Sequence, residues 1–212
     1  MEETLRLPYL NQTKPANLHL TNEDAMIDAA RAGDLEAFNQ LVVRYQDRAY
    51  GLAYRIMADE AAAADATQEA FISAYKHLDS FRGGSFKSWL YRIVVNACYD
   101  ALRYHRRRAA ISLDPSLDED EYASRFITSA EADCPDMIVQ RRELAKLLQH
   151  HIARLPIDQR TVLVLSDVQG LSYQEIAEAT RSSLGTVKSR LSRGRARMRQ
   201  SLWPHLKSMQ LV

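Results

Sequence analysis

The stretch LSYQEIAEATRSSLGTVKSRLSRGRARMRQSL, residues 171–202, decides the fold of the last quarter of the chain. Ser172 is followed three residues later by Glu175, and such a pair forms a capping box that starts a helix. A break at residues 181–183 follows, and Gly185 then opens a longer helix. Apolar residues recur along the longer helix at helical spacing and must face inward; they are Val187, Leu191, Met198 and Leu202. The stretch therefore predicts two helices joined by a tight turn.

The opposite side of the longer helix carries cations and hydroxyl groups. After Glu178 the chain has no acidic residue, whereas basic residues are frequent. The side chains that project from this side are Lys188, Ser189, Ser192, Arg193 and Arg199. A helix packed by one face and cationic on the other is suited to a DNA major groove, where Arg and Lys contact phosphates or guanine edges. The alternatives are a solvated basic helix and an RNA-binding tail.

The composition indicates a helical fold, and the use of cysteine indicates a reducing environment. The chain has 212 residues, 7 glycines, 26% charged residues and a net charge of +1. No convincing alternating strand pattern is present, so we expect an all-α fold. Cys98 and Cys134 lie far apart and fit a reducing cytoplasm. No apolar stretch is long enough to span a bilayer, and the N-terminus lacks a signal-peptide core. We expect a cytoplasmic protein without membrane insertion, cofactor or metal site.

Changes in composition divide the chain into two helical domains. Residues 1–20 contain two prolines and no sustained period, which predicts a flexible tail. Residues 21–108 form the first domain and include a long core helix. Residues 109–136 are rich in Asp and Glu and too weakly patterned to fold alone, which predicts a flexible acidic linker. Residues 137–207 form the second domain, which contains the stretch quoted above.

A helix from about Glu60 to His77 has two unlike sides. One side is a row of alanines, which predicts close packing in a core. The other side combines carboxylates, an amide and an apolar residue; its members are Asp65, Gln68, Glu69 and Ile72. Such a surface suits a basic partner helix. Composition alone leaves a simple solvated face as the alternative, because charged runs are usually solvated.

A loop with two glycines, residues 79–86, leads into a helix that runs from about Phe86 to Arg108. We expect Phe81 and Phe86 to be exposed. One side of the helix is apolar, and the other carries a tryptophan, an asparagine and a row of arginines; this side comprises Trp89, Arg92, Asn96, Tyr99, Arg103 and Arg106. Single-stranded nucleic acid fits this pattern, because bases stack on rings and cations follow the backbone. The alternative is that Trp89 plugs the core against the preceding loop.

Three motifs in this order resemble one known family. They are DATQEAF at residues 65–71, FRGG at 81–84 continued by SWLYRIVVN at 88–96, and GTVKSRL at 185–191. Together they resemble the RpoE-like, extracytoplasmic-function (ECF) group of RNA polymerase sigma factors within the sigma-70 family. The resemblance covers about residues 21–205. It implies a region 2 helical bundle, followed by a region 4 with a helix-turn-helix.

The resemblance implies a role for each surface. Asp65, Gln68, Glu69 and Ile72 match positions that bind the clamp helices of the polymerase β′ subunit. A second set of residues matches the part of the family that melts the minus-10 element and holds an extruded base. This set is Phe81, Arg82, Phe86, Trp89, Arg92, Asn96, Tyr99 and Arg103. The residues that match the minus-35 recognition surface are Arg181, Thr186, Lys188, Ser189, Ser192 and Arg193. Flipping a base costs a few kcal/mol, which stacking and edge contacts offset.

The implied function is promoter recognition on behalf of core RNA polymerase, without catalysis by this chain. The implied partners are the β′ clamp helices, the β flap, promoter DNA and an anti-sigma factor, and the implied regulon is a stress response. At the turn, Arg181 stands where the family usually has a glycine-like residue, and a positive φ there would cost on the order of 1 kcal/mol.

Two other functions compete with this one. A stand-alone helix-turn-helix regulator would bind specific duplex DNA tightly without polymerase. An enzyme with a DNA-binding tail ranks last, because the sequence has no nucleophile–base pair, metal-ligand spacing or phosphate loop.

Overall fold

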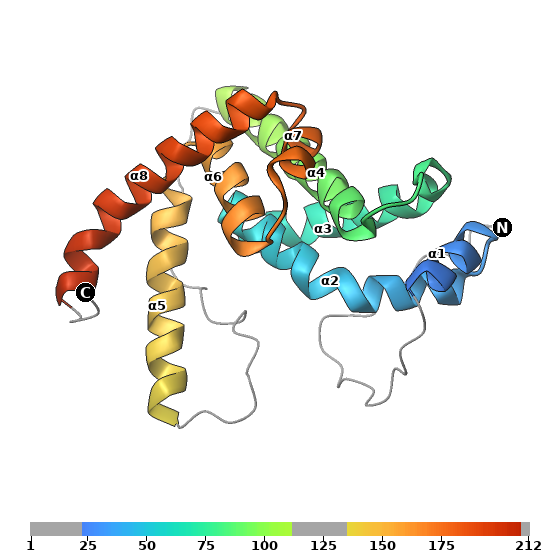
Figure 1. Ribbon diagram of the computed structural model, residues 1–212, viewed down its shortest axis with the longest axis horizontal. Coiled ribbons are helices and arrows are strands. Elements are labelled where there is room, and N and C mark those ends of the chain that lie inside the picture. Colours follow the sequence, from blue (N-terminus) through green and yellow to red (C-terminus); the bar gives the residue numbers. More distant parts are fainter. Residues whose placement is uncertain (1–22, 112–134, 209–212) are drawn as a thin grey trace.

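The computed structural model in Figure 1 describes residues 23–111 and 135–208. Its regular elements are all helical in these ranges, which confirms the expected all-α fold. The tail predicted at 1–20 and most of the linker predicted at 109–136 lie outside the described residues. We call residues 23–111 the first module and residues 135–208 the second module. No helix in these two ranges is long and apolar enough to cross a membrane.

The first module is built from long helices with well-defined ends. It consists of α1 (Glu23–Arg31), α2 (Leu35–Met57), α3 (Glu60–Lys76), a short 3-10 turn (Leu78–Ser80) and α4 (Phe86–Ile111). Asp34 starts α2, because its carboxylate accepts the backbone N–H groups of Glu36 at 2.9 Å and Ala37 at 3.1 Å. Gly33, at φ +97°, makes the turn between α1 and α2.

The core of the first module forms where the small side of α3 meets α2 and α4. Ala63, Ala70 and Ala74 are fully buried, and their size lets α3 approach its neighbours closely. Large side chains from the two neighbouring helices, such as Leu52 and Leu90, fill the rest of the core. The predicted alanine row is therefore confirmed. Its burial leaves the acidic side of α3 on the outside.

The second module contains the helix pair that the sequence predicted. It consists of α5 (Pro135–Ala153), α6 (Ile157–Leu163), a π-helical turn (Val164–Val168), α7 (Tyr173–Thr180) and α8 (Leu184–Ser208). The capping box is present, since the Ser172 hydroxyl accepts the Glu175 N–H and the Glu175 carboxylate accepts the Ser172 N–H at 2.8 Å. Arg181 ends α7 at φ 50°, so the anticipated left-handed strain at the turn is present.

The apolar stripe of α8 packs as predicted. Val187, Leu191, Met198 and Leu202 are all buried. In Figure 1, α8 runs from beside α7 past α6 towards the C-terminus. Gly194 lies where α8 meets α6, and a β-carbon there would sit 3.4 Å from the carbonyl oxygen of Gln159. Gly194 therefore marks a place where the two helices lie in close contact, with room for no more than a small side chain.

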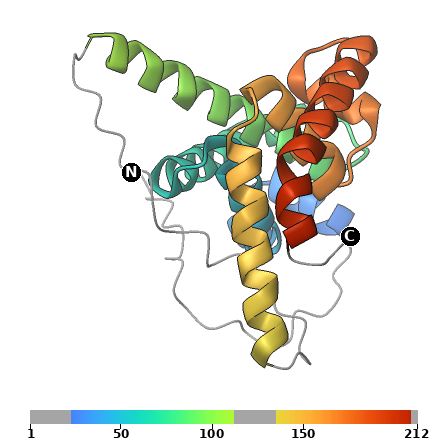
Figure 2. The same cartoon turned by 90° about the vertical axis from the view of Figure 1, so that its left-hand side faces the viewer.

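The two modules pack against each other. α7 lies beside α4, and α5 and α6 contact α2 (Figure 1). In Figure 2 the C-terminal half of α4 extends away from the second module. The helix itself continues to Ile111, past the expected end at Arg108. No local pattern in the sequence predicts this arrangement, because its contacts join residues that are far apart in the chain.

His151 lies between α5 and α8 among other imidazoles. Its ring centroid is 5.6 Å from that of His150 and 5.0 Å from that of His205. The residue is 4% exposed, and neither ring nitrogen has a hydrogen-bond partner among the described residues. Burial, together with His205, His150 and Arg154, lowers the pKa of His151. The folded module therefore favours the neutral imidazole.

Acidification is expected to destabilise the second module through His151. Its pKa is lower in the folded state than in the unfolded state, where it is about 6.5, so the unfolded chain binds more protons below that pH. The stabilisation is complete above about pH 6.5, and it falls by up to roughly 1.4 kcal/mol per pH unit as the pH approaches the folded-state pKa. Urea unfolding at about pH 7.5 and about pH 5.5, followed by circular dichroism, measures the loss.

Two variants isolate the contribution of His151. His151→Leu should remove most of the pH dependence, because the replacement does not titrate. His105→Gln, at an exposed position of α4, should retain it. An equal decline of stability with acid in both variants would show that another group is responsible.

Candidate DNA-binding and partner-binding surfaces

The acidic side of α3 forms an open surface, which we call the α3 patch. Asp65, Gln68 and Glu69 are exposed, and Ile72 is half-buried. Neither carboxylate forms an ion pair with a described residue. α3 packs mainly on α2, α4 and the 3-10 turn, so the second module leaves the patch uncovered. The sequence-predicted residues of this surface are therefore together and accessible.

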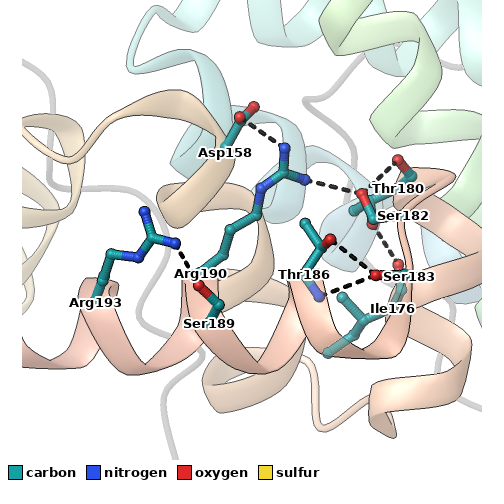
Figure 3. A network of polar contacts seen from close by, with 9 residues as sticks. All are labelled: Asp158, Ile176, Thr180, Ser182, Ser183, Thr186, Ser189, Arg190 and Arg193. Carbon is teal, nitrogen blue, oxygen red and sulfur yellow. Dashed lines mark hydrogen bonds and ion pairs between the residues drawn. The ribbon is translucent and has the colours of Figure 1, made fainter.

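The exposed side of α8 forms a second surface, which we call the α8 surface. It comprises Thr186, Lys188, Ser189, Ser192 and Arg193. Lys188, Ser192 and Arg193 are exposed, and the two other side chains are half-buried. Figure 3 shows the start of this helix, where the Ser183 hydroxyl accepts the backbone N–H of Thr186 at 3.1 Å. Because the apolar stripe on the opposite side of α8 is buried, the α8 surface faces away from the core.

Two arginines of the basic run have structural partners. Arg190 lies between Asp158 at 2.8 Å and the Ser182 hydroxyl at 2.9 Å (Figure 3). It therefore ties α8 to α6 and to the turn after α7. Arg195 binds the Asp167 carboxylate at 2.6 Å and 3.0 Å, and this contact lowers the pKa of Asp167. Lys188 and Arg193 are exposed and bind no described residue of another helix, although Arg193 donates to the Ser189 hydroxyl on α8 itself (Figure 3).

The aromatic residues of the loop and of α4 are buried, contrary to the expectation that they are exposed. Phe81 is 5% exposed, Phe86 2% and Trp89 9%. The three rings pack on one another with centroids 5.5 to 5.7 Å apart, because clustering removes their apolar area from water. Trp89 therefore plugs the core against the preceding loop, which was the alternative interpretation. Its indole N–H has no partner among the described residues.

The remaining residues of that side of α4 differ in accessibility. Arg92 and Arg103 are exposed, with Arg103 paired to Asp100 on the same helix, and Asn96 is half-buried. Tyr99 lies against α6, and burial raises the pKa of its phenol. Arg82 is exposed in the loop. The side predicted to hold single-stranded DNA is therefore partly covered by the second module.

Sequence reasoning missed the residues that join the modules. Gln169, in the turn before α7, accepts hydrogen bonds from Lys87 and Tyr91 of α4. Arg160 of α6 donates to the Ile56 carbonyl oxygen at the end of α2. Both are ordinary polar residues in their local context, so no pattern along the chain could have identified them.

Two family models match the chain, one in each module. A model described as Sigma-70 region 2 matches residues 41–108. A model described as Sigma-70, region 4 matches residues 145–198. The first match spans most of α2 together with α3 and the loop and helix that carry Trp89. The second extends from the middle of α5 into α8.

Solved structures share the fold. CnrH in complex with the cytosolic domain of CnrY is 27% identical, with a TM-score of 0.60 over 85% of this chain and 96% of that chain. The sigma factor RpoE in complex with the anti-sigma factor NepR from Bartonella quintana is 24% identical, with a TM-score of 0.63 over 79% and 98%. At 24% identity, this second likeness supports the fold alone.

Similarity to curated proteins extends over nearly the whole length of each relative. The RNA polymerase sigma-H factor of Pseudomonas aeruginosa is 36% identical over 186 residues, which cover 87% of this chain and 96% of the relative. The ECF RNA polymerase sigma-E factor of Escherichia coli K12 is 36% identical over 183 residues, which cover 86% and 95%. The chain therefore belongs to the ECF sigma factors of the sigma-70 family, which act with RNA polymerase in promoter-specific transcription initiation.

Proposed function

We propose that this sigma factor docks on the β′ clamp helices of core RNA polymerase through the α3 patch. The patch combines two carboxylates, an amide and a half-buried isoleucine, a composition suited to a basic helix with some apolar contact. The observation that carries the proposal is that the patch is exposed and uncovered by the second module. A stand-alone regulator binds DNA without polymerase, so it would not need a polymerase-binding surface in addition to its DNA-binding helix. Contact of the second module with the β flap is part of the same proposal.

The α8 surface reads the minus-35 element in the major groove. Lys188 and Arg193 are exposed cations on a helix whose opposite side is fixed by buried Val187 and Leu191. Arg and Lys bond guanine edges or phosphates, and Ser bonds either. Arg181 is exposed at the turn before α8, and in this proposal it contacts the DNA backbone at the same site.

The loop after α3 and the side of α4 that follows it melt the minus-10 element. Arg82 and Arg92 are exposed cations for the DNA backbone, and Asn96 offers the amide that matches an adenine edge. Phe81 and Trp89 line the cavity beside this loop, with Phe86 packed against both, and an extruded base would stack on the edge of this cluster. Tyr99 and Arg103 extend the same side towards the C-terminal end of α4.

An anti-sigma factor is the proposed inhibitor of this chain, and a stress-response regulon is its proposed target. Support for the inhibitor comes from CnrH, which is 27% identical to this chain and was solved in complex with the cytosolic domain of CnrY. The regulon rests on family membership alone.

Run-off transcription tests the proposed function. Core polymerase is mixed with the purified chain and a pool of promoter templates, and specific transcripts are expected only when both proteins are present. The competing function, a stand-alone helix-turn-helix regulator, predicts tight specific duplex binding by the chain alone and no polymerase-dependent transcripts. Failure to start transcripts on every template would overturn the proposal.

Replacing cations of α8 with alanine should distinguish residues that contact DNA bases from residues that stabilise the fold. Lys188→Ala or Arg193→Ala is expected to relax the minus-35 preference by roughly 1–3 kcal/mol if the residue bonds a base. Competition binding of the polymerase holoenzyme to promoters with single minus-35 substitutions measures this. Arg190→Ala is the contrasting variant, since it breaks the ties to Asp158 and Ser182 and should lower thermal stability. If Lys188→Ala weakens all sequences equally, the lysine contacts phosphate instead.

A further inference from the structure

Two ion pairs join α8 to the element that packs against it, which is α6 with its π-helical extension. Arg190 donates to the Asp158 carboxylate at 2.8 Å and to the Ser182 hydroxyl at 2.9 Å, as Figure 3 shows. Arg195 donates to both oxygens of the Asp167 carboxylate, at 2.6 Å and 3.0 Å. Asp158 stands in the first turn of α6, and Asp167 stands in the π-helical turn that follows it. The two carboxylates therefore hold α8 from opposite ends of one element.

The two arginines lie on opposite edges of the buried stripe of α8. Successive side chains of an α-helix are rotated by about 100° around its axis, so Arg190 and Arg195 stand about 140° apart. The buried residues of the stripe fall between them on this projection, namely Val187, Leu191, Met198 and Leu202. Rotation of α8 in either sense therefore pulls one guanidinium group away from its carboxylate. Together the two ion pairs restrain the rotation of the helix in both directions.

Burial of the stripe alone leaves the rotation of α8 less sharply defined. The hydrophobic effect is non-directional, so it decides which side of the helix faces inward. A hydrogen bond is directional, and the bidentate pair of Arg195 adds geometric specificity. The side chains of both pairs keep between 26% and 52% of their surface exposed, so each pair adds only modestly to the free energy of unfolding. The main consequence of the pairs is therefore orientation.

The rotation of α8 decides which of its side chains reach the bases of a bound DNA. Side chains extend about 5–6 Å from the helix axis, so a rotation of about 20° displaces them by about 2 Å. A hydrogen bond to a base edge does not survive this displacement, because its length varies over only about 0.5 Å. Contacts to phosphates depend mainly on charge and carry no sequence information. A change in rotation is therefore expected to reduce selectivity more than affinity.

We propose that Asp158 and Asp167 are positioning residues for minus-35 recognition, which fix the rotation of α8 without contacting DNA themselves. This inference rests on the proposed function of the α8 surface. It gives a role to two carboxylates in the DNA-binding module, where negative charge opposes binding to phosphates. It also accounts for Arg190 and Arg195, which orient the helix through these carboxylates.

The test removes each carboxylate with little change in side-chain shape. Asp158→Asn, Asp167→Asn and the double variant weaken the ion pairs, whereas Asp158→Glu and Asp167→Glu retain a carboxylate. The matched control is Glu143→Gln, at an exposed position of α5, which changes the net charge as each single Asn variant does. Circular dichroism verifies that each full-length protein is folded at the temperature of the assay. If the double variant unfolds, the single variants decide, because each weakens only one pair.

Selectivity is measured by competition binding of the polymerase holoenzyme to a pool of promoter duplexes with a randomised minus-35 element. The penalty in wild type, commonly about 5- to 150-fold per mismatched base pair, should fall at least about threefold in each Asn variant. Affinity for duplexes without a promoter should be unchanged or greater, because each variant loses a negative charge. The Glu variants should recover most of the wild-type penalty, and Glu143→Gln should keep all of it.

The base pairs affected distinguish a change of rotation from the loss of one contact. Lys188→Ala should relax the preference only at base pairs near the lysine, whereas the Asn variants should relax it at every base pair that α8 contacts. An effect confined to one base pair would mean that the carboxylate or its arginine acts on the DNA directly, and would overturn the inference. A wild-type penalty in the double variant would do the same, as would an equal fall in Glu143→Gln.

A measurement on the free chain separates this inference from the proposed function. Residual dipolar couplings of the backbone amides, measured by NMR, report the orientation of α8 relative to α6 without DNA or polymerase. They should differ from wild type in the double variant but not in Glu143→Gln, and unchanged couplings in the double variant would refute the positioning role. If the wild-type holoenzyme shows no minus-35 preference, the proposed function of the α8 surface fails, while the couplings still decide whether the two carboxylates orient the helix.

Discussion

Replacing Asp65 or Glu69 with arginine is expected to abolish co-purification of this sigma factor with core RNA polymerase. The α3 patch is proposed to meet a basic helix, so each reversal turns an attraction into a repulsion. Like charges placed together at an interface cost several kcal/mol, which corresponds to a loss of affinity of about a hundredfold or more. Affinity capture of core polymerase by the tagged chain, quantified over a range of protein concentrations, measures the effect.

The fold should survive these changes, because both side chains are exposed. The matched control is Asp47→Arg, which reverses an exposed carboxylate on α2 outside the patch. It should capture polymerase as wild type does. Unchanged capture by Asp65→Arg and Glu69→Arg would refute the assignment of this surface. Equal losses in all three would mean that general charge, not a defined patch, governs the association.

Trp89→Ala is expected to destabilise the first module by about 3–5 kcal/mol, the cost of deleting a large aromatic side chain from a core. Trp89 is 9% exposed and packs on both Phe81 and Phe86. The stability of a domain is about 5–15 kcal/mol, so this substitution would remove a large share of the free energy of unfolding. Urea unfolding followed by circular dichroism gives the change in free energy. A decrease below about 1 kcal/mol would contradict the packing described.

The role of the loop in DNA melting requires gentler variants. Trp89→Phe retains an aromatic ring but removes the indole N–H. Asn96→Ala, at a half-buried position, removes the amide proposed to recognise a base. Both are expected to reduce open-complex formation, measured by permanganate reactivity of the bubble, more than they reduce closed-complex binding. Equal loss at the two stages would argue against a melting role for this side of α4.

Local patterns were sufficient to predict most of the helices and several of their ends, although α4 continues to Ile111, past the expected end at Arg108. The capping box at Ser172 and Glu175, the apolar stripe of α8 and the alanine row of α3 are all present as expected. Each of these features depends on residues within a few positions of one another, where helical periodicity and capping chemistry leave few alternatives. The resemblance to the family likewise rests on short motifs in a fixed order.

The accessibility of the candidate site could not be predicted in the same way. An amphipathic pattern shows that the two sides of α4 differ, but it does not show what lies opposite the polar side. Trp89 was expected to face outward, yet Phe81 and Phe86 surround it and α7 lies across the adjoining surface. The helical pattern likewise placed Arg190 on the basic helix without revealing its bond to Asp158 on another helix.

The sequence by itself determined the helices, their caps and the residues that the α3 patch and the α8 surface contain, because these follow from short-range periodicity and from motif order. Only the tertiary structure decided which of those residues are available. It buried the aromatic cluster, paired Arg190 and Arg195 with carboxylates, and placed Glu175 and Glu178 at a cavity that the loop after α3 also lines. The physical reason is that burial and ion pairing depend on contacts between distant parts of the chain, which form only when the helices pack together.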